Sequence, residues 1–458
     1  MSAHRSGELP ERIGVAAVFG LAWPIMVSML SRTAMTTADT LYVGRLGTAH
    51  LAAIGLAGVA AWAGIAFGMG LLGGVNVTVS HRTGAGEHER ANRVWWQGLY
   101  WAGLISVIVV SLFWVGPWLF PLMGGSAEAT ELGSAWFRIR ILGSPLTFAT
   151  FALTAWFQGR GDTRTPMVAT LVANLLNIAI DPLLIFGFGP VQALGIAGAA
   201  YATNIALAVG LSFLLWKSRR VVAGFSAPRT DDLSEIFRLG SPLAVWYTLD
   251  VLAFGLFVAL LARVGEAELA AHVVVLRIIS VSFLPGHAVG EAGGVLVGQS
   301  LGAKRPGSAR EAWVSATKLG VGVMASFALI FLVVPDGLLW PFALEEEVSR
   351  VARKLLIVAA VFQVFDALAM VSLNALKGAG DTRFTMLVGV FSSWLVKLPL
   401  GIWLALPVGM GLGAVGAWLG LTADILFLAV VASWRILSGG WLRADKKAKE
   451  AEARKRAA

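Results

Sequence analysis

Long apolar runs alternate with short polar or basic segments along the whole chain. Twelve of these runs have the length that a transmembrane helix needs, about 20 apolar residues. We expect membrane spans at residues 14–43, 51–79, 94–120, 131–157, 165–187, 195–216, 240–262, 269–298, 312–335, 351–376, 383–406 and 411–436. Several runs are longer than a bilayer requires, which indicates tilted or kinked helices. The pattern predicts an all-α integral membrane protein with twelve transmembrane helices.

The second half of the chain repeats the first half at an offset of about 218 residues. The segment RLGTAHLAA at 45–53 returns as RVGEAELAA at 263–271, and GDTR returns at the same offset. A constant offset of this size predicts two homologous six-helix lobes, at residues 1–216 and 240–437. Two apolar repeats with a substrate site between them are typical of secondary transporters.

The composition agrees with a membrane setting. Hydrophobic residues make up 57% of the chain and charged residues 14%, whereas a soluble domain has about 25% charged residues. The formal net charge of +9 comes from Lys and Arg that lie mostly in loops and at the chain ends. Charge placed in this way sets membrane topology, so we expect no nucleic-acid partner. The chain has no cysteine, which excludes disulfides and thiolate metal sites.

The basic loops predict the orientation of the protein. They lie at 81–93, 160–164, 217–238, 304–310 and 377–383. By the positive-inside rule these loops are cytoplasmic, and an even number of spans places both termini on the same side. We expect a linker between the lobes at 217–239 and a basic cytoplasmic tail at 438–458. The prediction is a multi-pass monomer in the inner or plasma membrane.

Ionisable side chains inside the apolar spans are candidate functional groups, because burying them in a bilayer is costly. The repeat places Phe257 opposite Asp39 and Arg32 opposite Asp250, so the scaffold repeats while the charges differ. This asymmetry favours different chemical roles for the two lobes, although sequence drift would also produce it. The charged residues that we single out on this ground are Arg32, Asp39, Asp181, Asp250, Arg277, Glu291, Asp366 and Lys397.

One candidate site lies in the first lobe. Asn177 and Asp181 are one helical turn apart and share a face of the fifth span. With Asp39 and a hydroxyl such as that of Thr203, they offer hard oxygen ligands that suit a small cation such as Na⁺. Two neighbouring carboxylates also disfavour double ionisation, which suits the site to a proton. The alternative is that these side chains cap a broken helix or bond a neighbouring span.

The second lobe carries acids among aromatic residues. Asp250 follows Trp246 and Tyr247, and Asp366 follows Phe362. A carboxylate beside aromatic rings suits a bulky organic cation, through charge and cation–π contact. The aromatic residues alone are explained as well by lipid contact or by packing between helices.

Several residues receive no single role from the sequence. Arg32, Arg277 and Glu291 have none, and Lys397 either snorkels or pairs with a carboxylate. The chain has no G-x-x-x-x-G-K-[ST] loop, so we expect no direct use of ATP. No nucleophile–base constellation is visible, and we expect neither an enzyme nor a cofactor.

Six segments taken together resemble the multidrug and toxic compound extrusion (MATE) family. They are WPIM at 23–26, ADTLYVG at 38–44, GRGDT at 159–163, FLPG at 283–286, VLVGQSLGA at 295–303 and GAGDT at 378–382. In this order they cover nearly the whole chain. The resemblance implies two six-helix lobes with a large central cavity. It also implies export of organic cations coupled to inward flow of H⁺ or Na⁺.

The resemblance implies site residues as well. The family's first-lobe ion-binding cluster corresponds to Asp39, Asn177, Asp181 and Thr203, with a carbonyl from Ala199. The second-lobe acids of the NorM-type branch correspond to Asp250 and Asp366. Apart from the resemblance, Pro24 can kink the first helix and is our candidate hinge. We also place Tyr247, Phe362 and Glu291 in the candidate substrate cavity, without a specific role for Glu291.

Two departures from the NorM-type pattern concern the second lobe. Asp250 is one methylene shorter than the Glu of that branch, and Phe362 lacks the hydroxyl expected there. Both differences alter how the second lobe would coordinate a cation.

The sequence thus predicts a secondary active multidrug efflux transporter that exchanges organic cations for H⁺ or Na⁺ by alternating access. The first rival is a flippase for lipids or lipid-linked precursors, which Arg32, Arg277 and Lys397 favour and the acidic residues disfavour. A receptor or scaffold that transports nothing is a further rival, and the carboxylates inside the spans argue against it.

Overall fold

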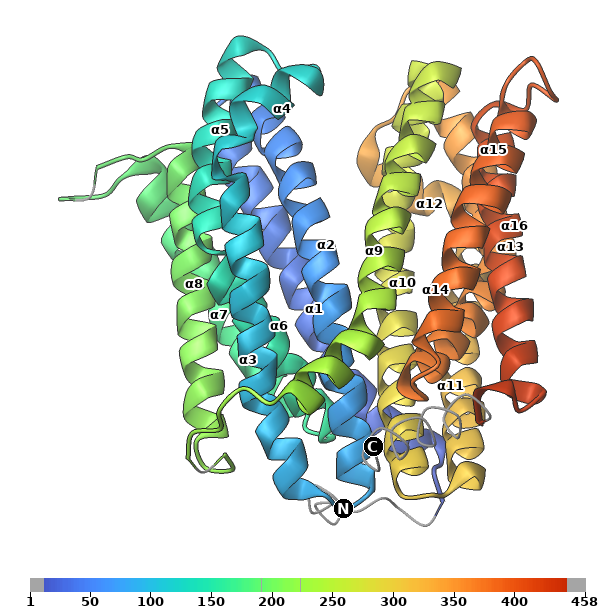
Figure 1. Cartoon of the computed structure of the whole chain (residues 1–458). Coiled ribbons are helices and arrows are strands. Elements are labelled where there is room, and N and C mark those ends of the chain that lie inside the picture. The colour runs from blue at the N-terminus through green and yellow to red at the C-terminus, as the bar shows by residue number, and fades with distance from the viewer. Residues whose placement is uncertain (1–11, 191, 223, 443–458) are drawn as a thin grey trace. The chain divides into compact units, whose positions relative to one another are not determined.

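The computed structural model describes residues 12–190, 192–222 and 224–442, and these residues are almost entirely helical (Figure 1). In this part of the chain, eleven helices are long and apolar enough to cross a membrane. The predicted span at 131–157 is instead divided into α5 (Ala127–Leu142) and α6 (Ser144–Gly159). Each has 16 residues, or about 24 Å of helix at about 1.5 Å per residue. The all-helical membrane fold is confirmed, and α5 and α6 together account for the twelfth crossing.

The described residues form two compact units. We call residues 27–83 and 87–244 the first unit, and residues 12–26, 84–86 and 245–442 the second unit. The first unit therefore includes the segment 217–239, which was predicted as a linker. Most of the predicted tail at 438–458 lies outside the described residues.

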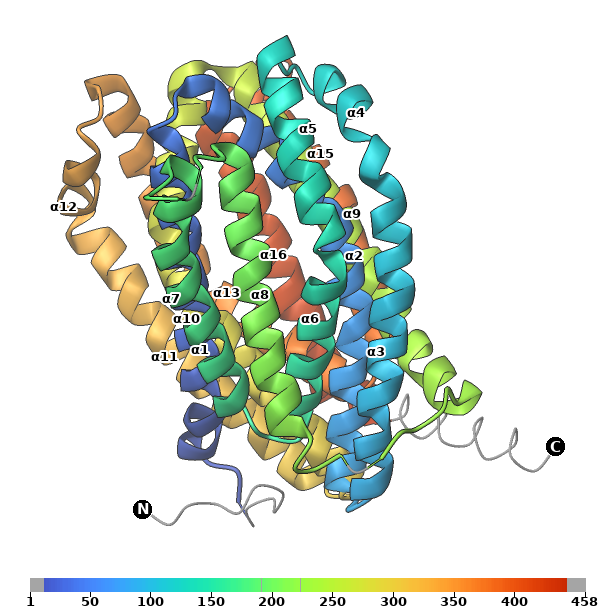
Figure 2. The ribbon, with the colours of Figure 1, turned by 90° about the vertical axis from the view of Figure 1, so that its left-hand side faces the viewer.

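The first unit is a bundle whose helices pack around buried aromatic side chains. Trp156 and Phe148 of α6 are fully buried, and the indole N–H of Trp156 donates to the carbonyl of Ala91 at 2.9 Å. Helices α7 and α8 run side by side (Figures 1 and 2). Besides α5 and α6, the elements are the later part of α1 (Val15–Gly44), α2 (Thr48–Gly84), α3 (His88–Val110), η1 (Ser111–Trp114), α4 (Gly116–Leu122), α7 (Arg164–Phe186), α8 (Ile196–Ser218) and the start of α9 (Thr230–Val264).

The second unit has a separate core. Trp418, Phe257 and Phe331 are at most 2% exposed. Helix α13 packs against α10, α11 and α16. Besides the remainder of α9, the elements are α10 (Glu266–Gly302), α11 (Pro306–Val333), α12 (Pro335–Leu339), η2 (Trp340–Phe342), α13 (Glu346–Gly378), α14 (Thr382–Phe391), the π-helical turn η3 (Ser392–Lys397), α15 (Leu398–Ala405) and α16 (Gly413–Leu437).

The internal repeat is visible in how two glycines pack. A Cβ on Gly159 of α6 would lie 2.8 Å from the carbonyl oxygen of Asn76 in α2. A Cβ on Gly378 of α13 would lie 2.0 Å from the carbonyl oxygen of Gly294 in α10. Both the glycines and their partners are related by the sequence offset. Each unit thus brings two helices into backbone contact at equivalent points, as small residues allow in membrane proteins.

A buried ion pair holds the start of α9 in the first unit. Arg82, near the end of α2, donates to Asp232 at 2.7 Å and to Glu235 at 2.5 Å. The side chains of Arg82 and Asp232 are 6% and 5% exposed. The contact explains why residues before 245 group with the first unit.

Candidate functional site

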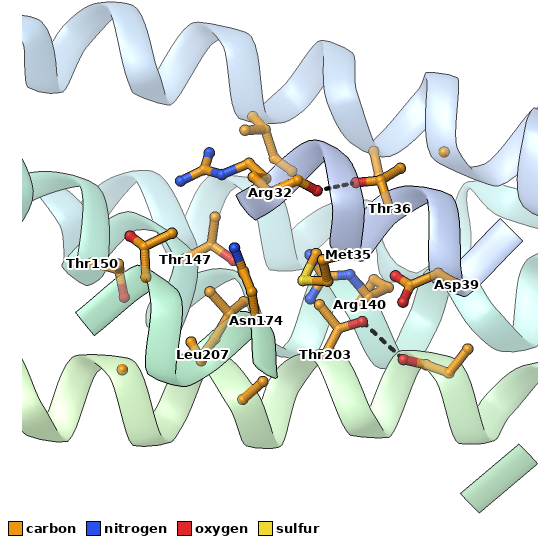
Figure 3. Close-up of a pocket in the computed structure, with 18 of the residues that line it drawn as sticks. Arg32, Met35, Thr36, Asp39, Arg140, Thr147, Thr150, Asn174, Thr203 and Leu207 are labelled. Atoms are coloured by element: carbon orange, nitrogen blue, oxygen red, sulfur yellow. Dashed lines mark hydrogen bonds between the residues drawn. The ribbon is translucent and has the colours of Figure 1, made fainter. Parts of the chain in front are cut away.

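A pocket of about 330 Å³ lies within the first unit, bounded by α1, α2, α5, α6, α7 and α8 (Figure 3). Its charged wall residues are Arg32, Asp39 and Arg140. Aromatic surface comes from Trp62, Trp136 and Phe151. Hydroxyl groups come from Thr36, Thr40, Thr147, Thr150, Thr170 and Thr203. The pocket therefore combines apolar surface with hydrogen-bonding groups and charges of both signs.

The structure brings the predicted first-lobe residues together at the wall of this pocket. The amide of Asn177 satisfies its neighbours when its nitrogen donates to Oδ1 of Asp39 at 2.9 Å and its oxygen accepts from the backbone N–H of Thr203 at 3.3 Å. The same amide lies 3.4 Å from Oδ1 of Asp181. Asp181 is also within side-chain hydrogen-bond reach of Asp39. We call Asp39, Asn177, Asp181 and Thr203 the first-lobe cluster.

The members of the first-lobe cluster differ in their access to the pocket. Asn177 and Asp181 are fully buried, whereas Asp39 and Thr203 line the pocket. The hydroxyl of Thr203 donates to the carbonyl of Ala199 at 2.8 Å (Figure 3). Asp39 thus contacts both the pocket and the buried residues Asn177 and Asp181.

Arg140 lies beside Asp39 and was not singled out from the sequence (Figure 3). It interacts with Asp39 through charge, and its guanidinium stands 5.9 Å from the ring centre of Trp136. The sequence feature that could have identified Arg140 is its position inside the apolar run 131–157. The first-lobe cluster therefore has a cation next to it in addition to its two acids.

Helix α1 carries a series of threonines on both sides of Asp39. Thr33, Thr36, Thr37 and Thr40 each donate to the carbonyl four residues earlier, at 2.8 to 3.2 Å. Hydroxyls bonded in this way commonly bend a helix. Pro24, the predicted hinge, lies inside the same helix nearer its start. The segment leading to Asp39 thus contains two features that favour bending.

In the second unit, a lysine joins two of the acids. Nζ of Lys397 lies 3.3 Å from Oδ1 of Asp250 and 3.7 Å from Oδ2 of Asp424. Of the two roles left open for Lys397, pairing with a carboxylate is the one observed. Asp366 interacts with Asp424 through charge. Asp424 was not singled out from the sequence, although it lies inside the apolar run 411–436.

Of the three residues assigned to a substrate cavity, two share a partner in the second unit and the third lies in its core. Glu291 is 3.9 Å from Nζ of Lys377, and Tyr247 bonds the same lysine. Phe362 is 3% exposed in the core, with its ring centre 6.1 Å from that of Trp418. Their assignment to a substrate cavity stays a prediction.

Among the residues that the structure describes, no three His, Cys, Asp or Glu side chains lie close enough together to hold a metal ion. The first-lobe cluster contains two acids, so a bound Na⁺ would also need oxygens from amide, hydroxyl or carbonyl groups. Such oxygens are present on Asn177, Thr203 and Ala199. The donor set is therefore compatible with a monovalent cation or with a proton.

The sequence profile of the family described as MatE matches residues 24–183 and 242–403. The two matched segments begin at the same offset that relates the internal repeats. Together they cover more than half of the chain and lie in both of its halves.

Named relatives extend over nearly the whole chain. The probable multidrug resistance protein NorM of Deinococcus radiodurans is 32% identical over 429 residues, which cover 92% of this chain and 94% of that protein. The multidrug resistance protein NorM of Burkholderia vietnamiensis is 31% identical, with 91% of this chain and 92% of that protein covered.

A solved structure shares the fold. It is described as the outward-facing conformation of a multidrug resistance MATE family transporter of the MOP superfamily. It has a TM-score of 0.85 and 24% sequence identity, and the match covers 95% of this chain and 98% of that chain.

Proposed function

This chain belongs to the MatE family, and we propose that it exports small organic cations from the cell by antiport with H⁺. The family resemblance drawn from the sequence motifs is confirmed. The names of the relatives support multidrug efflux, and the apolar helices support a multi-pass membrane protein. The organic-cation substrate, the antiport mechanism and the coupling ion are our proposal. So are a monomeric state and an inner-membrane location with cytoplasmic termini.

The observation that carries this proposal is the position of Asp39. Its carboxylate faces the pocket and also contacts the buried Asn177 and Asp181. A cationic substrate in the pocket and a coupling ion in the first-lobe cluster would both be stabilised by this single carboxylate. Each would then weaken binding of the other, and this reciprocal coupling is what antiport requires.

The geometry of Asn177 favours H⁺ over Na⁺ as the coupling ion. Its hydrogen bonds are satisfied when the amide nitrogen is turned toward Asp39, whereas an amide that coordinates Na⁺ would present its oxygen. Hydrogen-bond contact between Asp39 and Asp181 is favourable when the two carboxylates share one proton. Na⁺ remains the alternative ion, because turning the amide would offer an oxygen ligand.

The pocket wall supports an organic cation as the substrate. Trp62, Trp136 and Phe151 provide aromatic surface in the same pocket as Asp39, and such rings attract cations that have lost their water. In this proposal, proton binding at the first-lobe cluster favours a different bend of α1, with Pro24 as the hinge, and releases the substrate. An ion changes a conformational equilibrium only through different affinity for the two states.

A flippase for anionic lipids or lipid-linked precursors is the second candidate, and one specific observation favours it. Arg32 and Arg140 line the same pocket, and arginine is well suited to bind a phosphate group. The two arginines give the pocket more basic than acidic residues. A fluorescent phospholipid that crosses the bilayer of vesicles containing the protein would support this candidate.

The proposal is tested by ethidium transport in liposomes that contain the purified protein. An imposed pH gradient and an imposed Na⁺ gradient are applied separately, each to the parent protein and to Asp39→Asn. We expect transport with the pH gradient and its loss in Asp39→Asn, while that variant still inserts and elutes as a folded protein. Transport by Asp39→Asn at the parent rate would contradict the role of Asp39. Absence of transport under both gradients would favour the flippase.

A further inference from the structure

The lysine of the second unit lies in a group of oxygens that resembles a cation site. Besides the carboxylates of Asp250 and Asp424, Nζ of Lys397 lies 3.3 Å from the hydroxyl of Ser393. Ser393 donates to Oδ1 of Asp250 at 2.6 Å, and Ser392 donates to Oδ1 of Asp424. We call these five residues the acid–lysine cluster. Carboxylates and hydroxyls around one positive charge are the ligands that a hard cation prefers.

The backbone at this point departs from a regular α-helix. The cluster's two serines and Lys397 belong to the π-helical turn η3, between α14 and α15. Pro399 follows at the start of α15, and a proline has no N–H to continue the regular hydrogen-bond pattern. Single π-helical turns are rare and frequently occur at functional sites. All three residues are buried, with 0%, 2% and 4% of the whole residue exposed for Ser392, Ser393 and Lys397.

The neighbouring tryptophan fixes this turn against α9. The indole N–H of Trp394 donates to the carbonyl of Leu249 at 3.2 Å. Leu249 directly precedes Asp250, so the contact sets the distance between the turn and the carboxylate. The ammonium of Lys397 is therefore held at the acids by the fold, in addition to the attraction between the charges.

The cluster is accessible from one side. The side chain of Asp250 is 47% exposed, whereas those of Lys397 and Asp424 are 5% and 6% exposed. Two acids contact the lysine, and a third, Asp366, interacts with Asp424 through charge. Acidic charge thus exceeds basic charge here, and an external cation could approach through Asp250. The position that it would take between Asp250 and Asp424 is filled by the ammonium of Lys397.

We propose that Lys397 is a tethered cation that occupies the second-lobe acidic site and excludes an external alkali cation from it. A tethered group competes at a high effective concentration, in the millimolar range or above for short flexible tethers. Free Na⁺ would therefore bind only weakly while the ammonium is in place. This inference rests on the proposed function in one respect, because it assumes that the coupling ion binds at the first-lobe cluster and not at the acid–lysine cluster.

The proposal makes Lys397 a residue that determines ion specificity. Replacing it by a neutral side chain leaves the buried Asp424 without a counter-charge and beside the half-exposed Asp250, and an uncompensated buried charge is strongly unfavourable. Uptake of Na⁺ between the carboxylates and the two serine hydroxyls would relieve this repulsion. Loss of the ammonium should consequently create a Na⁺ site.

The test is binding of radioactive Na⁺ to purified protein in detergent, which requires no transport. All variants carry Asp39→Asn, so that the first-lobe cluster does not contribute. We expect Lys397→Gln to bind one Na⁺ with an affinity at least about tenfold higher than its Asp39→Asn parent, a difference of about 1.4 kcal/mol. We expect Lys397→Arg to match the parent, because a guanidinium keeps the positive charge. Adding Asp250→Asn to Lys397→Gln should abolish the gained binding.

Equal Na⁺ binding in the parent and in Lys397→Gln would overturn the proposal. A gain that persists after Asp250→Asn would also overturn it, because the new site would then lie elsewhere. If Lys397→Gln does not fold, Lys397→Gln with Asp366→Asn is compared with Asp366→Asn alone, because this pair removes one acidic charge near Asp424 and keeps both carboxylates of the site. Equal Na⁺ binding there has the same meaning. Failure of ethidium transport in liposomes would contradict the proposed function and leave this binding result unaffected.

Discussion

Nη1 of Arg140 donates to Oδ1 of Asn204 at 2.5 Å, which connects α5 with α8 beside the pocket. Asn204 also donates from Nδ2 to the carbonyl of Ile139 at 2.7 Å. A Cβ on Gly143 would lie 2.1 Å from the same Oδ1. The break between α5 and α6 therefore occurs where α8 needs space for Asn204. One amide thus determines both where the predicted fourth span divides and how Arg140 is held near Asp39.

Gly143→Ala should destabilise the protein, because the added methyl group has no space beside Asn204. We expect a loss of about 1–3 kcal/mol, which is typical of overpacking, and a lower melting temperature by tryptophan fluorescence in detergent. Gly103→Ala in α3 is the matched control, since a Cβ there meets nothing within 4 Å. Equal melting temperatures for the two variants would show that α8 moves aside without cost.

Asn177→Ala should impair ion coupling, because it removes the amide between Asp39 and the backbone of Thr203. Leaving buried polar groups without a partner costs about 1–3 kcal/mol, so a lower melting temperature is also expected. The measurement is the initial rate of ethidium transport driven by a pH gradient. Asn92→Ala is the control, because Asn92 is not part of the pocket wall and donates to the carbonyl of Val221 instead, at 3.2 Å. If both variants lose the same fraction of transport, the first-lobe cluster has no special role.

The sequence predicted the transmembrane spans and the first-lobe cluster for physical reasons. A span is a local property of about 20 residues, and a repeat is visible without any knowledge of contacts. Asn177 and Asp181 are one turn apart, so a helix necessarily places them on the same face. Asp39 was grouped with these two residues because their oxygens together suit a small cation, and the family resemblance implied the same group. The structure places all three together.

Other parts of the site depend on packing between distant segments. Lys397 and Asp250 are 147 residues apart, and the sequence contains nothing that selects this partner over another acid. Arg140 and Asp424 each lie within a long apolar run, where one charge is easily overlooked. The division of the fourth span had a local signal in Gly143 and Pro145, but the length of the apolar run concealed it.

Arg82→Met should strongly destabilise the first unit. It leaves Asp232 and Glu235 without their buried partner, and breaking a buried pair in this way costs about 3–5 kcal/mol. Arg93→Met is the control, because Arg93 is 34% exposed and 3.9 Å from Asp232. Pairs that are partly exposed contribute about 0–1 kcal/mol. Thermal unfolding in detergent measures both variants, and similar losses would mean that the start of α9 is held by other contacts.

Replacing two threonines of α1 tests whether this helix bends during transport. Thr33 and Thr37 bond the carbonyls of Met29 and Thr33, and neither threonine is part of the pocket wall. Thr33→Val with Thr37→Val keeps the side-chain shape but removes both hydroxyls, which should make a bent α1 less favourable. The maximal rate of ethidium transport should fall severalfold, whereas the ethidium concentration at half-maximal rate should stay the same.

The control for this double variant is Ser212→Ala, which removes a similar bond to the carbonyl of Ala208 in α8. We expect that variant to transport at the parent rate, because the proposal assigns bending to α1. A change in the half-saturating concentration would place the two threonines at the substrate instead of the hinge. An unchanged maximal rate would mean that Pro24 bends α1 without help from the threonines. Adding Pro24→Ala to the double threonine variant should then lower the maximal rate.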